Sequence, residues 1–174
     1  MMLLTLALTG GLHMDGLMDT CDAVFSRKDI DTRLKILSDT HAGSFAVMGC
    51  VIIMMAKTLL FAEISGHCTE IFFIPVYSRL GMSIMLNDLP FAKSQGLAVM
   101  LGASRDKRNN IIFALMAVVL LVFGSKIIAV SFWMCLAIWC RVCMKVFCGI
   151  TGDLLGAFVE LSEVIMLGVI ISCT

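Results

Sequence analysis

The chain has 174 residues, of which 60% are hydrophobic and only 15% are charged, and its formal net charge is zero. Soluble domains carry roughly 25% charged residues, and a soluble chain this apolar would expose large patches and aggregate. A neutral chain also offers no argument for nucleic-acid binding. The composition therefore predicts an all-α fold, a polytopic transmembrane helix bundle that lies in the lipid bilayer as one integral membrane domain over residues 1–174.

The apolar segments follow one another with polar connections between them. Met1–Leu8 is too short to cross a bilayer, which needs about 20 residues. We expect it to be the end of a transmembrane helix that starts before this sequence and continues to Asp22, so that the domain is N-terminally incomplete. The further expected apolar segments are 44–64, 71–86, 111–123, 127–147 and 151–173.

Most basic residues lie in connections that fall on one side of the membrane. They are the connections 26–41 and 87–110, together with the basic end of an apolar segment at 141–145. The positive-inside rule places this side in the cytoplasm. We therefore expect a multi-pass protein whose basic side, together with the acidic segment at residues 15–22, faces the cytoplasm.

Eight cysteines do not indicate a disulfide scaffold here, because the chain is not a small polar secreted domain. Cys140 and Cys143 form a C-x-x-C pattern inside an apolar segment. No second such pair accompanies them in the sequence. The cysteines are therefore expected to be small buried thiols.

The most informative segment is TGGLHMDGLMDTCD at residues 9–22. It spaces Asp15, Asp19 and Asp22 at i, i+4 and i+7, so a helix presents all three carboxylates on one face. Charges at membrane depth cost about 2.5 kcal/mol or more each, and like charges repel one another. A divalent cation offsets both costs, and oxygen-only ligands favour Mg2+. The alternative is an exposed helix with a solvated acidic face.

The last apolar segment begins with a second polar group. Asp153, Gly156, Glu160 and Glu163 are spaced by three, four and three residues, which is one stripe of a helix. Acids in a membrane helix indicate function by default. Thr151 is a suitable N-cap, and a helix N-terminus suits a phosphate. The alternative is structural pairing of these acids with Lys or Arg, above all for Glu163.

Three further polar residues have two interpretations each. Arg79 lies in an apolar segment and needs an anion, which is either a carboxylate or a bound phosphate. His13 is either a partner of the acidic segment or a buried histidine with its own hydrogen bonds. Lys93 lies in a polar loop, where a solvated charge is the default and phosphate binding is the alternative.

These motifs resemble the signatures of the cobalamin synthase (adenosylcobinamide-GDP ribazoletransferase) family. The similarity starts at residues 9–22 and continues through RLKILSDTHAG at 33–43, YSR at 77–79, AK at 92–93 with GL at 96–97, and TGDLLGA at 151–157 with EL at 160–161. The blocks occur in the family's order, and the first and last are specific. Members of the family usually carry additional N-terminal transmembrane sequence, and Cys148-Gly149 stands where a Gly-Gly pair is usual.

The resemblance implies a membrane transferase that joins adenosylcobinamide-GDP to α-ribazole or its 5′-phosphate. The products are adenosylcobalamin, or its phosphate, and GMP. The resemblance also implies a bacterial or archaeal cytoplasmic (inner) membrane, with the active site facing the cytoplasm. We expect Mg2+ as cofactor, bridging the pyrophosphate oxygens and neutralising the leaving GMP. The expected metal ligands are Asp15, Asp19, Asp22 and Asp39. Either Asp39 or Asp153 completes the metal shell or accepts a proton from the attacking hydroxyl.

The expected catalytic residues are Asp15, Asp19, Asp22 and Asp153. The expected substrate contacts are His13, Arg33, Arg79, Lys93, Thr151, Gly152 and Glu160. The sequence is compatible with an oligomer.

Three alternatives stay open. A CDP-alcohol phosphotransferase would have Ala-Arg soon after its Asp-Gly pair, whereas Leu-Met-Asp follows Asp15-Gly16 here. A cation transporter would use acids of both motifs as an ion site at the membrane midplane. The third alternative is a non-catalytic remnant of an enzyme. A corrinoid-dependent assay distinguishes the enzyme from the remnant, and ion flux identifies a transporter.

Overall fold

The computed structural model describes residues 6–7, 9–64, 68–102 and 105–173, and these residues form helices without a β-strand. This confirms the predicted all-α helix bundle. The helices are α2 (Leu12–Phe25), α3 (Ile30–Ile36), α4 (Ser44–Glu63), α5 (Cys68–Asp88), α6 (Leu97–Leu101), α7 (Lys107–Phe123), α8 (Lys126–Phe147) and α9 (Gly152–Ser172).

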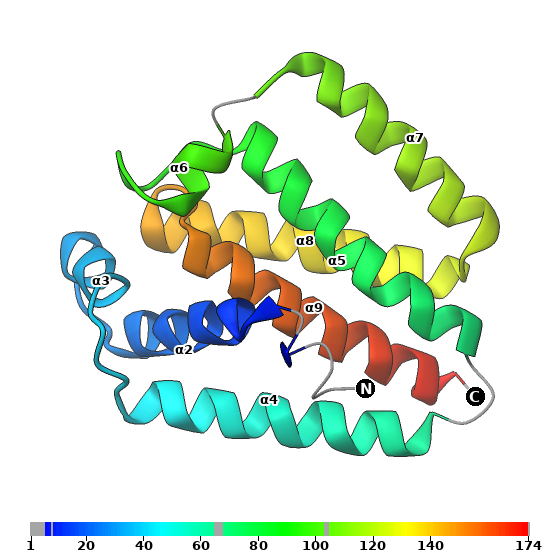
Figure 1. The fold of residues 1–174 in the computed structure, drawn as a ribbon, viewed down its shortest axis with the longest axis horizontal. Helices are drawn as coiled ribbons and strands as arrows, with labels where there is room; N and C mark the ends of the chain where they lie inside the picture. Colours follow the sequence, from blue (N-terminus) through cyan, green and yellow to red (C-terminus); the bar gives the residue numbers. More distant parts are fainter. Residues whose placement is uncertain (1–5, 8, 65–67, 103–104, 174) are drawn as a thin grey trace.

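Helix α9 lies at the centre of the bundle (Figure 1). It contacts α2 and α4 on one side and α5 and α8 on the other, while α7 lies outside α5. A helix that is apolar around most of its circumference is stable only where neighbours or lipid cover it. Most of α9 is buried inside the bundle, so this helix is the core around which the others are arranged.

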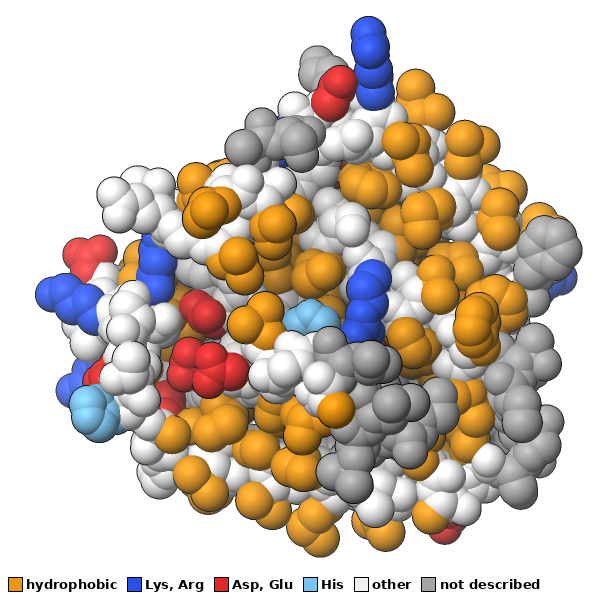
Figure 2. Space-filling model, viewed as in Figure 1, with side chains coloured by type: hydrophobic (Ala, Val, Ile, Leu, Met, Phe, Trp, Pro, Cys, Tyr) orange, Lys and Arg blue, Asp and Glu red, His pale blue; other side chains and the backbone are white. Residues whose placement is uncertain are grey.

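Three helices of the described chain, α4, α8 and α9, are long and apolar enough to cross a membrane. Helices α5 and α7 cover the other two expected segments, but α7 is shorter and α5 is less apolar because it contains residues such as Arg79. Large hydrophobic side chains are exposed along α4 and α7, and Figure 2 shows how much of the visible face they occupy. A surface of this kind fits lipid better than water.

The polar connections expected on one side of the membrane do lie together. Helix α3, helix α6 and the turn between α8 and α9 lie at the same end of the bundle, on the left in Figure 1. Helices α4 and α9 both begin at this end. The grouping of the basic loops predicted from the sequence is therefore confirmed.

The expectation of one continuous helix reaching Asp22 is wrong. Gly10 and Gly11 have φ angles of 60° and 75°, a left-handed conformation that glycine adopts without a Cβ clash. The amide of Gly11 donates to the carbonyl of Leu6, and α2 begins only at Leu12. The two glycines thus separate the acidic helix from the apolar residues before it, of which 1–5 and 8 lie outside the described residues.

Among the residues whose side chains the structure describes, seven cysteines are free thiols. Cys143 is buried as expected, whereas Cys148 and Cys173 are exposed. The expectation of buried thiols is therefore correct only in part.

Candidate active site

The two acidic motifs meet where α2 crosses the beginning of α9. A Cβ placed on Gly16 would lie 2.7 Å from the carbonyl oxygen of Asp153, and one placed on Gly156 would lie 3.0 Å from the Cα of His13. Glycine at both positions lets the two backbones approach this closely. The crossing therefore brings residues from opposite ends of the sequence together.

Three carboxylates surround Asp19 at this crossing. Partial burial, followed by the negative charges of Asp15, Asp153 and Asp22, raises the pKa of Asp19 from 3.8 to about 6, while Lys93 acts in the opposite direction. Like charges held this close disfavour the ionised form of each other. The site thus concentrates negative charge, and a bound divalent cation would relieve the repulsion between these carboxylates.

Asp22 already has backbone partners in the structure. Its Oδ2 accepts from the amide of Gly43 at 2.6 Å and its Oδ1 from the amide of Ala46 at 2.9 Å. These amides lie at the beginning of α4, where backbone donors have no partner within the helix. Asp22 therefore caps α4 and ties it to α2, which the spacing of the acids did not reveal.

Asp39 lies apart from the other acids. It is exposed, and its Oδ1 contacts the backbone amide of His41 at 3.0 Å and the Nδ1 of His41 at 2.7 Å. These hydrogen bonds lower the pKa of Asp39 below its usual value. Of the two candidates for a fourth acid, the fold places Asp153 beside Asp15 and Asp19, and it places Asp39 in the connection between α3 and α4.

A cavity of about 540 Å³ opens at this end of the bundle. Five of the expected site residues line it, namely Asp15, Lys93, Thr151, Gly152 and Asp153. Ser38, Gln95 and Gly96 also line it, and the sequence analysis did not single out any of these three as site residues. The cavity therefore has an acidic wall from α2 and α9 and a cation from the loop before α6.

A short backbone pairing brings Lys93 to the cavity. Ala92 donates to the carbonyl of Ile150 and Ile150 donates to the carbonyl of Pro90, each at 2.9 Å. Gly149 permits this approach, because a Cβ there would lie 2.7 Å from the Pro90 oxygen. The Nζ of Lys93 then donates to the hydroxyl of Ser38 at 2.7 Å. Lys93 is thus held beside the N-terminus of α9.

Thr151 is the N-cap of α9, as predicted. Its hydroxyl accepts from the amide of Leu154 at 3.4 Å and donates to the Oδ2 of Asp153 at 3.2 Å. The first amides of a helix point outward and carry partial positive charge. Together with Lys93, they offer donors for a phosphate group in the cavity that Asp15 and Asp153 also line.

Nearly the whole chain matches a known family. The family model of cobalamin-5-phosphate synthase matches residues 1–171. The chain belongs to this family.

Curated relatives agree with this assignment. An adenosylcobinamide-GDP ribazoletransferase from Geobacillus thermodenitrificans is 35% identical, over 94% of this chain and 67% of the relative. One from Halalkalibacterium halodurans is 32% identical, over 97% of this chain and 70% of the relative. The chain thus spans about two thirds of the length of these relatives. No solved structure was found to match it.

Four expected substrate contacts of this cobalamin synthase family member do not line the cavity of about 540 Å³. Glu160 is paired with Lys57, and Arg79 is paired with Glu163. Arg33 donates to the carbonyl of Val146 at 3.3 Å. The sequence left open whether Arg79 meets a carboxylate or a phosphate, and whether Glu163 has a structural partner. In the fold, Arg79 and Glu163 pair with each other.

Two of these four residues, His13 and Arg33, each have one polar side-chain atom without a hydrogen-bond partner. The Nδ1 of His13 and the Nε of Arg33 are buried without a hydrogen-bond partner. His13 packs on Gly156 at the crossing of α2 and α9. A role in substrate binding stays a prediction for both residues.

The residues fit a magnesium ion shared with a substrate. Within the described ranges, no three His, Cys, Asp or Glu side chains converge on one point as a ready-made metal site. Mg2+ is commonly held by one or two carboxylates together with substrate phosphates and water rather than by a protein cage. Asp15 and Asp153 facing one cavity, with Asp19 in the same charge cluster, meet that requirement.

Proposed function

We propose that the chain catalyses the transfer from adenosylcobinamide-GDP to α-ribazole or its 5′-phosphate, with release of GMP. In this reaction a ribazole hydroxyl attacks the phosphorus on the corrinoid side of the pyrophosphate, and the P–O bond to GMP breaks. Membership of the cobalamin synthase family supports the reaction, and the names of the curated relatives support the substrates.

The observation that carries the proposal is the chemistry of the cavity walls. Asp15, Asp153, Lys93 and the capped N-terminus of α9 all line one cavity of about 540 Å³. A pyrophosphate needs cationic donors for its oxygens, and phosphoryl transfer needs compensation of the charge on the leaving group. A cavity with both kinds of group suits that anion.

The charged residues in and beside the cavity have different proposed roles. Lys93 and the first amides of α9 bind pyrophosphate oxygens and orient them. Asp15 and Asp19 would hold Mg2+, which supplies neutralisation of the phosphate charge when bound. Asp153, kept in place by its hydrogen bond from Thr151, accepts the proton of the attacking hydroxyl. Asp22 contributes by fixing α4 against α2.

We also propose the inner membrane as the site of this reaction, with the cavity open to the cytoplasm. The three basic connections lie at the end of the bundle that holds the cavity. An excess of Lys and Arg is typical of the cytoplasmic side. A water-soluble nucleotide substrate would then reach the cavity from the cytoplasm, while the apolar helices remain in lipid.

Transfer by the chain in membranes tests the proposal. The assay contains adenosylcobinamide-GDP, α-ribazole and Mg2+ and follows GMP and cobalamin, with the Geobacillus relative as positive control. Asp19→Ala is expected to abolish transfer while leaving membrane insertion intact. Asp31→Asn, which removes an exposed carboxylate of α3, is the matched control and is expected to keep full activity. Full activity of Asp19→Ala would contradict the proposed site.

Lys93 provides a second variant pair. Lys93→Met removes the cation and is expected to raise the KM for adenosylcobinamide-GDP by about tenfold or more, since a hydrogen bond to a charged group contributes about 1.5–3 kcal/mol. Lys93→Arg keeps the cation and is expected to retain most of the affinity. Equal KM values for both variants would contradict the assignment of Lys93 to the pyrophosphate site.

A further inference from the structure

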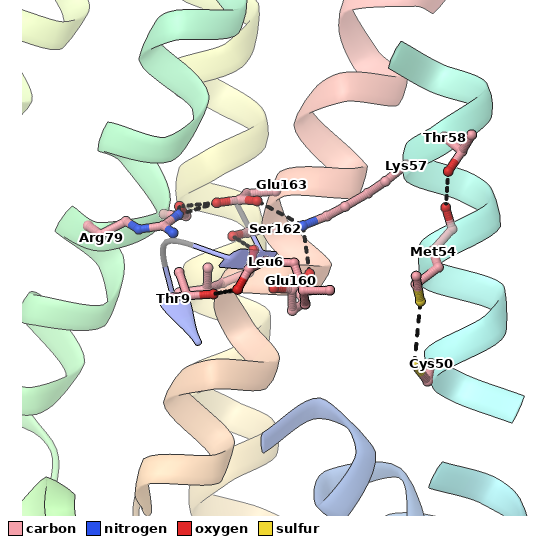
Figure 3. Close-up of polar contacts among 12 residues, drawn as sticks. Leu6, Thr9, Cys50, Met54, Lys57, Thr58, Arg79, Glu160, Ser162 and Glu163 are labelled. Carbon is pink, nitrogen blue, oxygen red and sulfur yellow. Dashed lines mark hydrogen bonds and ion pairs between the residues drawn. The ribbon is translucent and has the colours of Figure 1, made fainter. Parts of the chain in front are cut away.

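A buried ionic network joins α4, α9 and α5 (Figure 3). Lys57 of α4 is only 3% exposed, and its Nζ donates to the Oε2 of Glu160 at 2.6 Å and to the Oε2 of Glu163 at 2.8 Å. Both acids belong to α9, one turn apart. A charged lysine removed from solvent requires such partners, so Lys57 joins α4 to α9 at one defined position.

The same acid binds a second helix. The Oε1 of Glu163 accepts from the guanidinium of Arg79 and, at 3.0 Å, from the hydroxyl of Ser78, both on α5. Two carboxylates and two cations balance one another in this network. Helix α9 is therefore held from α4 on one side and from α5 on the other.

Helix α4 is attached to the acidic cluster as well. At its beginning, the amides of Gly43 and Ala46 bind the carboxylate of Asp22 on α2. Three turns further on, Lys57 binds α9. Helix α4 thus connects α2 to α9 at two separate points, and these are the two helices whose carboxylates face one another at the cavity.

The network affects the register of α9, which is its position along and around its own axis relative to α4. Glu160 lies seven residues after Asp153, which is about 10 Å along a helix. Lipid tails are as apolar as aliphatic side chains, so no hydrophobic driving force holds two membrane helices in one register, and interhelical hydrogen bonds add a directional restraint. A displacement of α9 along or around its axis would lengthen the two hydrogen bonds from Lys57, so the network opposes a shift of Glu160 and, with it, of Asp153.

We propose that Lys57, through Glu160, is a positioning residue of the transfer site. Neither side chain lines the cavity of about 540 Å³, and their pairing holds Asp153 and the N-terminus of α9 opposite Asp15 and Asp19. This inference rests on the proposed function, because its effect is measured on transfer. It assigns to Lys57 a part in the reaction that its place in an apolar helix did not indicate.

The experiment compares four variants by transfer rate and by thermal unfolding in detergent. Lys57→Met and Glu160→Leu each leave the partner charge unbalanced, so both are expected to lower the melting temperature and kcat. Lys57→Met/Glu160→Leu removes both charges and leaves Glu163 paired with Arg79. Replacing a whole buried ion pair by apolar residues is often neutral or stabilising, so this protein is expected to unfold near the wild-type temperature.

The double variant decides between positioning and mere stabilisation. Its kcat is expected to stay about tenfold or more below the wild-type value, because a small misplacement of reacting groups has effects of this size. The control is Ile53→Ala, a buried residue one turn before Lys57 on α4. It is expected to lower the melting temperature and to leave kcat per folded protein unchanged.

Two results would overturn the inference. One is a wild-type kcat in the double variant, which means that the pair only stabilises the fold. The other is an equal loss of kcat in Ile53→Ala, which means that any loss of packing on α4 has the same effect. A wild-type protein without transfer activity would instead contradict the proposed function, so the two failures are distinguishable.

Discussion

Gly16 of α2 lies directly against Asp153 of α9, so closely that a Cβ on Gly16 would be 2.7 Å from the Asp153 carbonyl oxygen and 2.8 Å from its Cα. These atoms belong to backbone, which moves less readily than the end of a side chain. The distance between the two acidic motifs is therefore set by the absence of a side chain at position 16.

Gly16→Ala is expected to push α2 away from α9 at this contact. The added methyl group overpacks the crossing, which costs about 1–3 kcal/mol of unfolding free energy, and it separates Asp15 from Asp153, so transfer activity is expected to fall as well. Thermal unfolding and the transfer assay measure the two effects.

Gly168→Ala is the matched control for this change. Gly168 also lies in a helix, but nothing lies within 4 Å of an added Cβ there. Alanine stabilises a helix interior by about 0.5–1 kcal/mol relative to glycine, so the control is expected to raise the melting temperature and to keep activity. A Gly16→Ala protein as stable and active as Gly168→Ala would contradict the close contact.

The pKa of Asp19 predicts how Mg2+ dependence changes with pH. This pKa is raised to about 6, and a metal ion competes with the proton for the ionised carboxylate. Below about pH 6 the Mg2+ concentration for half-maximal activity is expected to rise about tenfold for each pH unit, as expected for one displaced proton. Above about pH 7 it is expected to be constant.

Without metal, the free energy of unfolding is expected to fall as the pH rises through the range in which Asp19 loses its proton. Between about pH 4 and pH 6, folded Asp19 holds its proton more tightly than unfolded Asp19, so this residue makes the fold less stable as the pH rises. Unfolding in EDTA across this range measures the slope, and Asp19→Asn is expected to reduce it. An unchanged slope in that variant would assign the pH effect to another group.

Asp22 is expected to differ from Asp19 in its effect on stability. Asp22→Ala removes the acceptor of two amides at the beginning of α4, and losing such a cap costs about 0.5–2 kcal/mol. Asp19→Ala relieves repulsion instead and is expected to keep or raise the melting temperature without metal. If Asp22 served only as a metal ligand, its replacement would leave the metal-free protein as stable as before.

Cys148 is expected to be a position where glycine stabilises the fold. It ends α8 with φ 57° and ψ 22°, the left-handed conformation, which costs a residue with a Cβ about 1–2 kcal/mol. Cys148→Gly is therefore expected to raise the unfolding free energy by about 1 kcal/mol. Cys148→Ala keeps the Cβ and is expected to give no such gain, which separates the backbone effect from loss of the thiol.

The local elements of this protein follow from short-range patterns in its sequence. Apolar runs of helical length predict α4, α8 and α9, and Thr151 caps α9 because its hydroxyl bonds an amide three residues later. The spacing of Asp15 and Asp19 places them on one helix within one turn. Each of these features depends on residues close together in the chain, so periodicity and capping chemistry are sufficient to predict them.

The composition of the site was decided by contacts between residues far apart in the chain. Asp153 rather than Asp39 joins Asp15 because the glycines of α2 and α9 let these helices cross, and Asp22 caps α4. The partners of the buried acids, Lys57 and Arg79, come from two other helices. A charged residue in an apolar segment indicates that it needs an ion-pair partner, but the packing of the helices determines which residue becomes that partner.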